Sequence, residues 1–258
     1  MRGAATALTV VLQLVTLLSL YKAADSQSGA STSAGVYAGQ QPDSCGYGVI
    51  APSISPHLAS FSKSSPLLAP LPSSGCGACV QGVCSAAPTP LTVKIVDTSS
   101  VEIQLSAADM DTVSPQGNRL GHVDVSLQQV DCPVSGNILV RLQQLAPMAG
   151  GYAKLALLNV AGSNGITAVG LAPAGTQTFA PLKNSYGAVW EGSLPAAPPL
   201  DMQVASGGQT LLVRGIITGS TTPGDITSTV QFTATGLGNA ATAGHTPSLI
   251  RFPALLVN

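Results

Sequence analysis

The sequence predicts an all-β protein that is secreted, and three observations support this prediction. The 28 glycines and 19 prolines among 258 residues, with a hydrophobic share of 45%, favour short strands joined by turns over long helices. Short runs alternate apolar and polar residues in the way that is typical of barrel or sandwich strands. Near the N-terminus, Arg2 precedes a weakly polar to apolar run from Ala4 to Leu20, which is typical of a secretion signal.

The length of the chain suggests two domains, because domains cluster near about 100 to 150 residues. Charged residues make up only 8% of the chain and the formal net charge is −1, which excludes an electrostatic nucleic-acid binder. The three histidines, His57, His122 and His245, lie at no metal-ligand spacing from one another. We therefore expect neither a metal site nor a cofactor.

Residues 1–24 are expected to be a signal peptide, with the cleavage point left open between residues 24 and 30. Cleavage after Ala24 would place a lysine at the −3 position, whereas Ser28-Gly29-Ala30 fits the small-x-small rule but lies further downstream. The alternative is an uncleaved anchor, although an apolar run of about 17 residues is short of the ~20 needed to span a bilayer. After signal removal we expect no membrane association. The Ser/Gly/Ala-rich residues 25–43 are expected to form a flexible leader.

In the first half of the chain, alternating runs at residues 91–96 and 122–127 predict strands, each bounded by Pro, Ser or Gly. The one predicted helix is short. It begins at Ser106, with Asp109 three residues later as in a capping box, and it ends by Pro115.

After about residue 148 the pattern changes to a series of short apolar runs separated by Gly, Pro and Asn. The predicted strands cover residues 152–160, 166–171, 200–204, 211–217 and 226–233. This spacing predicts a small β-sandwich.

All five cysteines lie before this second half, at positions Cys45, Cys76, Cys79, Cys84 and Cys132. A Cys-x-x-Cys pair is compatible with zinc or redox chemistry, but zinc requires four clustered ligands and thioredoxin-like chemistry a βαβ context. Structural disulfides are therefore favoured in a secreted chain. Because five is an odd number, one thiol is left over or pairs outside the chain.

An ordered set of motifs over about residues 43–235 resembles the expansins and expansin-like proteins, wall-loosening proteins of plants and microbes. The motifs are Cys-Gly-Tyr-Gly at 45–48, Cys-Gly-Ala-Cys at 76–79, the strand and helix start at 93–106, Val-Asp-Cys at 130–132, and the stretches 153–160, 179–182 and 186–190. The resemblance implies a double-psi β-barrel, here residues 44–146, and an immunoglobulin-like β-sandwich that binds polysaccharide, here residues 147–235. Residues 236–258 would then be a C-terminal extension.

The resemblance also implies a disulfide pairing, in which Cys45 is bonded to Cys76 and Cys79 to Cys132. The usual family partner of Cys84 is absent from residues 85–88. Cys84 is therefore expected to be a free or intermolecular thiol.

The acidic residues of the barrel are the candidates for a polysaccharide groove. Asp97 matches the first family aspartate, whereas Gln104 stands at the position of the second and Glu102 at that of a family histidine. An amide does not shuttle a proton at neutral pH, so no catalytic residue is predicted. Two alternatives stay open: Glu102 supplies the missing carboxylate, or Asp97 only forms an Asx-type turn. Asp109 and His57 are expected at the solvent-exposed surface without a role.

Aromatic residues of the second half are the candidates for carbohydrate binding, because sugar rings lie with their apolar C–H faces on aromatic side chains. These candidates are Tyr152, Phe179, Tyr186 and Trp190. The alternative is that they pack in the sandwich core, which applies most to Trp190 and Phe179. Tyr152 and Tyr186 are favoured, since a hydroxyl suits a half-exposed position.

These observations together predict a secreted, monomeric, expansin-like protein of the cell wall. It is expected to bind a cellulose-like glucan or another wall polysaccharide and to loosen noncovalent polymer contacts without hydrolysis. One alternative is a glycosidase of the same barrel fold, and another is a wall-structural or signalling module without loosening activity.

Overall fold

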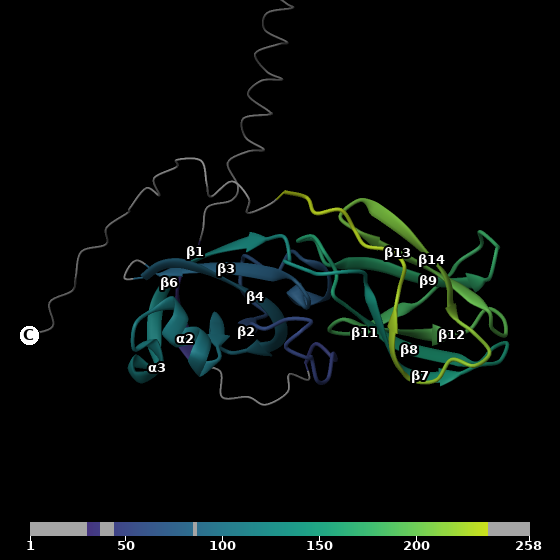
Figure 1. The fold of residues 1–258 in the computed structure, drawn as a ribbon, viewed down its shortest axis with the longest axis horizontal. Helices are drawn as coiled ribbons and strands as arrows, with labels where there is room; N and C mark the ends of the chain where they lie inside the picture. Colours follow the sequence, from purple (N-terminus) through teal and green to yellow (C-terminus); the bar gives the residue numbers. More distant parts are fainter. Residues whose placement is uncertain (1–29, 37–43, 85–86, 237–258) are drawn as a thin grey trace, which may run out of the picture.

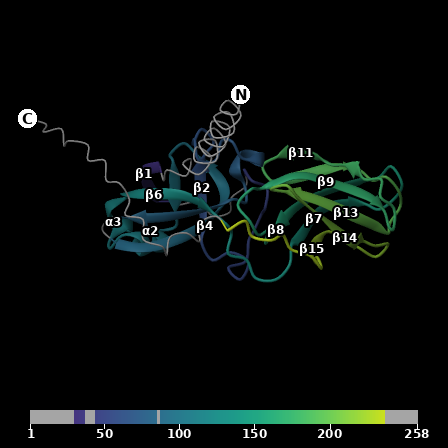
Figure 2. The same ribbon diagram turned by 90° about the horizontal axis from the view of Figure 1, so that it is seen from above.

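The computed structural model describes residues 30–36, 44–84 and 87–236, which form two units that lie side by side along the long axis of the molecule (Figure 1). Figure 2 shows the same two units from above, with the barrel strands at one end and the sandwich strands at the other. The predicted signal peptide over residues 1–24 lies outside the described residues, as does the C-terminal extension from residue 237 onward. In the part of the chain that is described, no helix is both long and apolar enough to cross a membrane.

The first unit is a barrel whose strands close in the order β1-β5-β2-β4-β3-β6. Its strands are β1 (Ala30–Val36), β2 (Leu58–Ser62), β3 (Cys79–Cys84), β4 (Ala87–Ser99), β5 (Ile103–Leu105) and β6 (His122–Val130). β1 runs parallel to β5 and β2 parallel to β4, whereas the other neighbours are antiparallel. Because side chains alternate along a strand, Val93 and Ile95 of β4 fill the barrel core, and Val96 points outward.

Strand β1 corrects the expectation of a flexible leader over residues 25–43. Ala30–Val36 pairs with β6 from Ala30 to Gly35 and with β5 from Ala34 to Val36, and so closes the barrel. Small residues lowered the strand signal in the sequence. In the fold, however, this segment fills the gap between two strand edges, and its backbone hydrogen bonds are satisfied there.

Helix α2 (Ala107–Val113) begins where the capping pattern predicts it. The Oγ atom of Ser106 accepts a hydrogen bond from the backbone N–H of Asp109 at 3.1 Å. Met110 and Val113 are buried in the barrel core. Two shorter helical segments are also described, the 3-10 turn η1 (Pro72–Gly75) and helix α3 (Gly117–Leu120).

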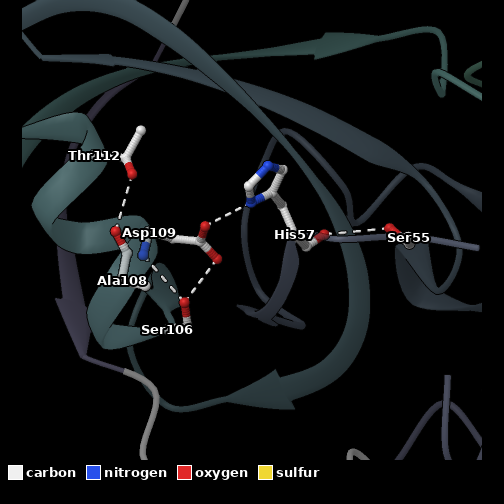
Figure 3. A network of polar contacts seen from close by, with 6 residues as sticks. All are labelled: Ser55, His57, Ser106, Ala108, Asp109 and Thr112. Carbon is white, nitrogen blue, oxygen red and sulfur yellow. Dashed lines mark hydrogen bonds and ion pairs between the residues drawn. The ribbon is translucent and has the colours of Figure 1, made fainter. Parts of the chain in front are cut away.

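Asp109 is not a solvated helix residue, and this expectation from the sequence is wrong. Its side chain is only 7% exposed, and its Oδ1 atom lies 2.6 Å from Nδ1 of His57, just before β2 (Figure 3). The hydroxyl of Ser106 donates to Oδ2 of the same carboxylate at 2.8 Å. The network ties the start of α2 to the segment that enters β2, a contact between residues 52 positions apart in sequence.

The second unit consists of two sheets with strand orders β10-β9-β13-β14 and β11-β12-β8-β7-β15. Its strands are β7 (Leu139–Ala146), β8 (Tyr152–Leu158), β9 (Ile166–Pro173), β10 (Ala180–Pro181), β11 (Lys183–Tyr186), β12 (Val189–Ser193), β13 (Leu200–Ser206), β14 (Gln209–Ile217) and β15 (Gly224–Thr227). Their inward side chains share one apolar core, which includes Leu155 from the five-stranded sheet and Leu171 and Met202 from the four-stranded sheet.

The boundary between the units lies earlier than the expected division at residue 146. Strand β7 pairs with β8 and β15 in the five-stranded sheet, so Leu139–Ala146 belongs to the second unit. The reason is the hairpin between β7 and β8, whose turn contains the Pro-Met-Ala-Gly-Gly run at residues 147–151, so the change of pattern near residue 148 lies inside the second unit.

The structure contains the disulfides Cys45–Cys76 and Cys79–Cys132. Cys84 is a free thiol and is 5% exposed, within the barrel core. Its burial favours the free thiol over an intermolecular bridge.

Residues 44–50, which we term the junction segment, lie between the barrel and the five-stranded sheet. An apolar cluster joins this segment to both units, with the buried members Cys45, Tyr47, Ile50, Cys76, Val96, Ala156, Leu158 and Ala188. Polar contacts run from the sheet to the backbone of the segment. Arg141 donates from Nη1 to the carbonyl of Tyr47 at 2.6 Å, and Gln143 donates to the carbonyl of Gly46 at 2.6 Å.

Lys94 of β4 is buried at the same junction. The residue is only 7% exposed, and within the described part of the chain its side chain makes no hydrogen bond or ion pair. Desolvation by burial lowers the pKa of its ammonium from 10.5 to about 8.

Replacing Asp109 by alanine should lower the free energy of unfolding by about 1 to 3 kcal/mol, because His57 and Ser106 then lose their buried acceptor. Urea unfolding of the full chain measures this change. Asp111→Ala is the matched control, since Asp111 is exposed on the same helix and surface substitutions stay within about 0.5 kcal/mol. Equal losses in the two variants would contradict a stabilising role for the buried network.

The burial of Lys94 should make the stability of the protein rise between pH 8 and pH 10. In this window the unfolded chain binds a proton at Lys94 that the folded chain has released, because the folded pKa is about 8 and the unfolded one about 10.5. The full effect is about 3 kcal/mol. Urea unfolding of the wild type and of Lys94→Met across this window measures it. The expected result is a rise in the wild type that exceeds the change in the variant, and parallel curves would refute it.

Candidate functional site

The outer face of the five-stranded sheet brings polar and aromatic side chains together. Strand alternation turns Leu155 into the core and Tyr152 and Lys154 outward. In the register of the sheet, Glu191 of β12 lies opposite Lys154 of β8 and opposite Lys183 of β11. We call the surface formed by Tyr152, Lys154, Lys183, Tyr186 and Glu191 the outer-face platform.

Tyr186 is the most exposed aromatic residue of the platform, at 45%. The ammonium of Lys154 lies 5.2 Å from the centroid of its ring, a cation–π contact. On the side of the junction segment, Gly46 lies close to the ring. A Cβ atom built at this glycine would come within 2.9 Å of Cε2 of Tyr186. The ring is therefore held in position at the edge of the sheet while nearly half of its surface faces solvent.

Tyr152 is half-buried and is oriented by a hydrogen bond. Its hydroxyl donates to Oε2 of Glu191 at 2.6 Å. This hydrogen bond raises the pKa of Tyr152 to about 12, because ionisation of the phenol would break it. The phenol therefore remains protonated and the ring orientation remains fixed near neutral pH.

Two of the four predicted aromatic residues are not part of the platform. Trp190 is 6% exposed and packs in the sandwich core, so its assignment to carbohydrate binding is wrong. It faces inward because it is directly opposite Leu155 on β8, which also faces the core. Phe179 precedes β10, and its Cβ lies close to Gly170 of β9. It therefore lies beside the four-stranded sheet, away from the surface formed by Tyr152 and Tyr186.

The groove candidates of the barrel lie on neighbouring strands. Ser60 of β2 is opposite Asp97 of β4 and also opposite Gln104 of β5. Adjacent strands are about 4.8 Å apart, so Asp97 and Gln104 lie about 10 Å apart in one row across the barrel wall. The amide oxygen of Gln104 accepts a hydrogen bond from the hydroxyl of Ser60 at 3.0 Å.

Asp97 and Glu102 have different hydrogen-bond partners. Oδ1 of Asp97 accepts from the backbone N–H of Thr98 at 2.8 Å and from the hydroxyl of Ser44. Glu102 accepts a hydrogen bond from Ser65 in the turn after β2. The contact of Asp97 with Thr98 is local, as the turn interpretation predicts, whereas the contact with Ser44 ties it to the junction segment.

The chemistry that this row allows is hydrogen bonding by Asp97 and Gln104, which are partly exposed, whereas Ser60 is fully buried between them. Asp97 is the one carboxylate in the row with Ser60 and Gln104, and the described contact of Glu102 is directed to Ser65. Inverting hydrolysis requires two carboxyl groups about 6.5 to 9.5 Å apart, one as acid and one as base. Among the described residues, no cluster of three or more potential ligands is placed to hold a metal ion.

The sequence did not predict the contributions of Lys154 and Glu191 to the platform. Lys154 could have been found from strand alternation, because it lies two residues from Tyr152 and therefore on the same face. Glu191 could not, since its place depends on the register between β8 and β12. The charge pattern did not mark Lys94 either. Strand alternation places its side chain on the outer face of the barrel, where residues of the junction segment and of the second unit lie around it.

Comparison with known proteins found relatives in sequence and in structure, although no protein-family model matches. Expansin-B11 of Zea mays is 24% identical over 155 residues, which cover 54% of this chain and 57% of that protein. Expansin-B10 of Zea mays is 24% identical over 152 residues, covering 53% and 56%. The chain thus matches these curated relatives over little more than half of their length.

Two solved structures have the same fold. The crystal structure of an apo expansin from Clavibacter michiganensis superposes with a TM-score of 0.60 at 20% identity, over 78% of this chain and 97% of the other. A mutant of that expansin in complex with cellohexaose superposes with the same TM-score, 0.60, at 18% identity, over 78% of this chain and 98% of the other. The likeness covers both the barrel and the sandwich, since it spans nearly all of the solved chains.

Proposed function

Because the chain is a divergent expansin-like protein, we propose that it binds cell-wall polysaccharide and loosens noncovalent contacts between polymers without hydrolysing them. On this proposal the closed barrel is a double-psi β-barrel and the two packed sheets are an immunoglobulin-like sandwich. The domain boundary then lies between Cys132 and Leu139, and the barrel includes residues 30–36. The chain would act as a secreted monomer after removal of residues 1–24.

The observation that carries the proposal is the exposed ring of Tyr186 on the outer-face platform. A sugar ring that lies on this phenol buries apolar C–H groups, and the side chains around it offer polar contacts to the hydroxyls. Lys154 has a flexible stem, so its ammonium can move aside from the ring and donate to the bound sugar. Tyr152, whose hydroxyl hydrogen is donated to Glu191, and the carboxylate of Glu191 supply fixed acceptor oxygens beside it. The cellohexaose complex of the Clavibacter expansin supports a glucan as the ligand class.

The absence of hydrolysis is proposed from the row of Asp97, Ser60 and Gln104. An amide at position 104 accepts and donates hydrogen bonds but provides no proton for a leaving oxygen. Asp97 by itself cannot be acid and base in the same step. The partly exposed Asp97 and Gln104 would hydrogen-bond to sugar hydroxyls, which suits binding along a groove.

Loosening is proposed to arise from competition for polymer surfaces. A segment of polysaccharide that is held by the platform and by the barrel row makes its hydrogen bonds and stacking contacts with the protein instead of with a neighbouring polymer. Packing across the junction segment keeps the two surfaces in a fixed relation, and this supports simultaneous contact. Coupling of two weak sites raises the overall affinity through a high effective concentration.

Replacing Tyr186 by alanine should weaken binding to an insoluble glucan about fivefold, because an aromatic contact of this kind contributes about 1 kcal/mol. Pull-down isotherms of the full chain on cellulose, xylan and pectin measure the effect and identify the preferred polymer. Leu120→Ala is the matched control, since it removes a side chain on the barrel whose residue is 60% exposed. Circular dichroism confirms that each variant is folded. Unchanged binding by folded Tyr186→Ala would exclude the platform.

The purified protein should release no reducing ends from these polymers, and Glu102→Gln should behave in the same way. Reducing-end assays over long incubation test this, with wall creep or polymer binding measured in parallel. Activity in the wild type that disappears in Glu102→Gln would identify Glu102 as the missing acid and establish the glycosidase alternative. Binding without either hydrolysis or creep would favour a wall-structural module.

A further inference from the structure

We propose that the outer-face platform binds wall polymers that carry uronic acids in preference to neutral glucans, and that Lys154 recognises the carboxylate. The preference rests on the proposed function, because it names the substrate class of the same surface. Three features of the described residues support it: the distribution of charge in the second unit, the position of the Lys154 ammonium over an aromatic ring, and the hydrogen bond that engages Glu191.

Unpaired charge in the second unit is concentrated on the platform. Residues 139–236 contain seven charged side chains. Four of them form the ion pairs Arg141–Asp225 and Arg214–Asp201. The other three are Lys154, Lys183 and Glu191, which lie in one row across strands β8, β12 and β11. Within the described ranges neither lysine forms an ion pair, so the platform carries two positive charges and one negative charge.

The ammonium of Lys154 covers part of the ring on which a sugar would stack. It lies over Tyr186 at 5.2 Å from the ring centroid. A sugar that stacks on this face displaces the ammonium, and the cation–π contact is then lost. A neutral sugar offers the displaced ammonium only hydroxyl groups, whereas a uronic acid offers it a carboxylate, and charge-assisted hydrogen bonds are the stronger ones. The resting position of Lys154 therefore favours acidic sugars.

The two lysines are spaced to meet a polymer rather than a single acid. Glu191 is opposite Lys154 on one side and opposite Lys183 on the other, and adjacent strands are about 4.8 Å apart, so the Cα atoms of the lysines lie about 10 Å apart. Both side chains have flexible stems that let the ammonium follow a ligand. A polyuronate carries a carboxylate on each sugar. One sugar on Tyr186 can therefore contact Lys154 while a neighbouring sugar is attracted by the exposed Lys183.

Glu191 is the negative charge that opposes this attraction. Its Oε2 atom accepts a hydrogen bond from the hydroxyl of Tyr152 at 2.6 Å, and among the described residues it pairs with neither lysine. Its charge repels a bound carboxylate. A glutamine at this position would keep an acceptor oxygen for Tyr152 and remove the charge, so it should strengthen the binding of an acidic polymer.

The experiment compares polygalacturonic acid with the same polymer after its carboxyl groups have been reduced to alcohols, which leaves the linkage unchanged and removes the charge. Binding of the full chain to each immobilised polymer is measured with a chelator present, which excludes calcium bridges. We expect at least threefold tighter binding to the acidic polymer and a difference that shrinks as salt is added. Equal binding of the two polymers, or binding of cellulose or xylan alone, would overturn the preference and leave the proposed function standing. Binding of no wall polysaccharide would overturn both.

Variants then separate the platform from general ionic effects. Lys154→Met should lower the affinity for the acidic polymer about threefold and that for the reduced polymer by less, whereas Glu191→Gln should raise the affinity for the acidic polymer. Lys63→Met is the matched control, because it removes the same charge from an exposed position in the turn after β2 and should bind as the wild type does. Circular dichroism confirms that each variant is folded. The proposal is overturned if Lys154→Met weakens both polymers by the same factor, if Lys63→Met has the effect of Lys154→Met, or if Glu191→Gln weakens acidic binding.

Discussion

The architecture depends on how the junction segment is fixed between the two units. The disulfide Cys45–Cys76 attaches it to the barrel, and the carbonyl of Cys45 accepts a hydrogen bond from the backbone N–H of Ala188 at 2.9 Å. Neighbouring residues of the segment contact different parts of the protein. Ser44 contacts the carboxylate of Asp97, Gly46 lies beside Tyr186, and Tyr47 packs in the apolar cluster between the two units. This short segment thus contacts the barrel row and the platform at once.

This close approach explains why glycine occurs at particular positions. A Cβ at Gly46 would come within 2.3 Å of Cγ2 of Val189, and one at Gly187 within 2.5 Å of Cα of Cys45. Both glycines also have positive φ angles, +73° and +48°, which other residues rarely adopt. The glycine and cysteine of the Cys-Gly-Tyr-Gly motif are therefore explained by backbone packing at the junction, and its tyrosine by burial in the apolar cluster there. The sequence marked the motif through a resemblance, but its physical reason appears only when the second unit is in place.

Local patterns of the sequence predicted the elements well where one face of a strand is apolar. The strands containing Val93 and Val123 and the helix capped by Ser106 follow directly from alternation and capping. Prediction failed where the secondary structure or the burial of a residue depends on partners that are distant in sequence. Ala30–Val36 has little strand propensity and becomes a strand because two edges need it. Asp109 is buried because His57 comes to it from another part of the barrel, and no local rule reveals such a pair.

The candidate site shows the same division between local and distant information. Tyr152 was identified from its residue type and its place in a strand, and Trp190 was misassigned because its opposite neighbour, Leu155, was unknown. A residue's face depends on register, and a slip of one residue reverses it. The sequence could therefore name the candidate aromatic residues, but it could not say which of them face solvent and which face the core.

The substitution of an amide for a carboxylate has a limited physical effect on the barrel row. Gln104 keeps a polar group opposite Ser60, and the hydrogen bond between them is satisfied without a charge. Asp97 and Gln104 remain partly exposed on either side of the buried Ser60, and the row avoids the repulsion that a second carboxylate on the same side of the barrel would introduce. What it loses is the ability to transfer a proton in the transition state. Since the junction segment fixes Asp97 through Ser44 and borders Tyr186 through Gly46, loss of proton transfer leaves both surfaces intact. On the proposed function, such a fold would hold a polymer at two surfaces without hydrolysing it.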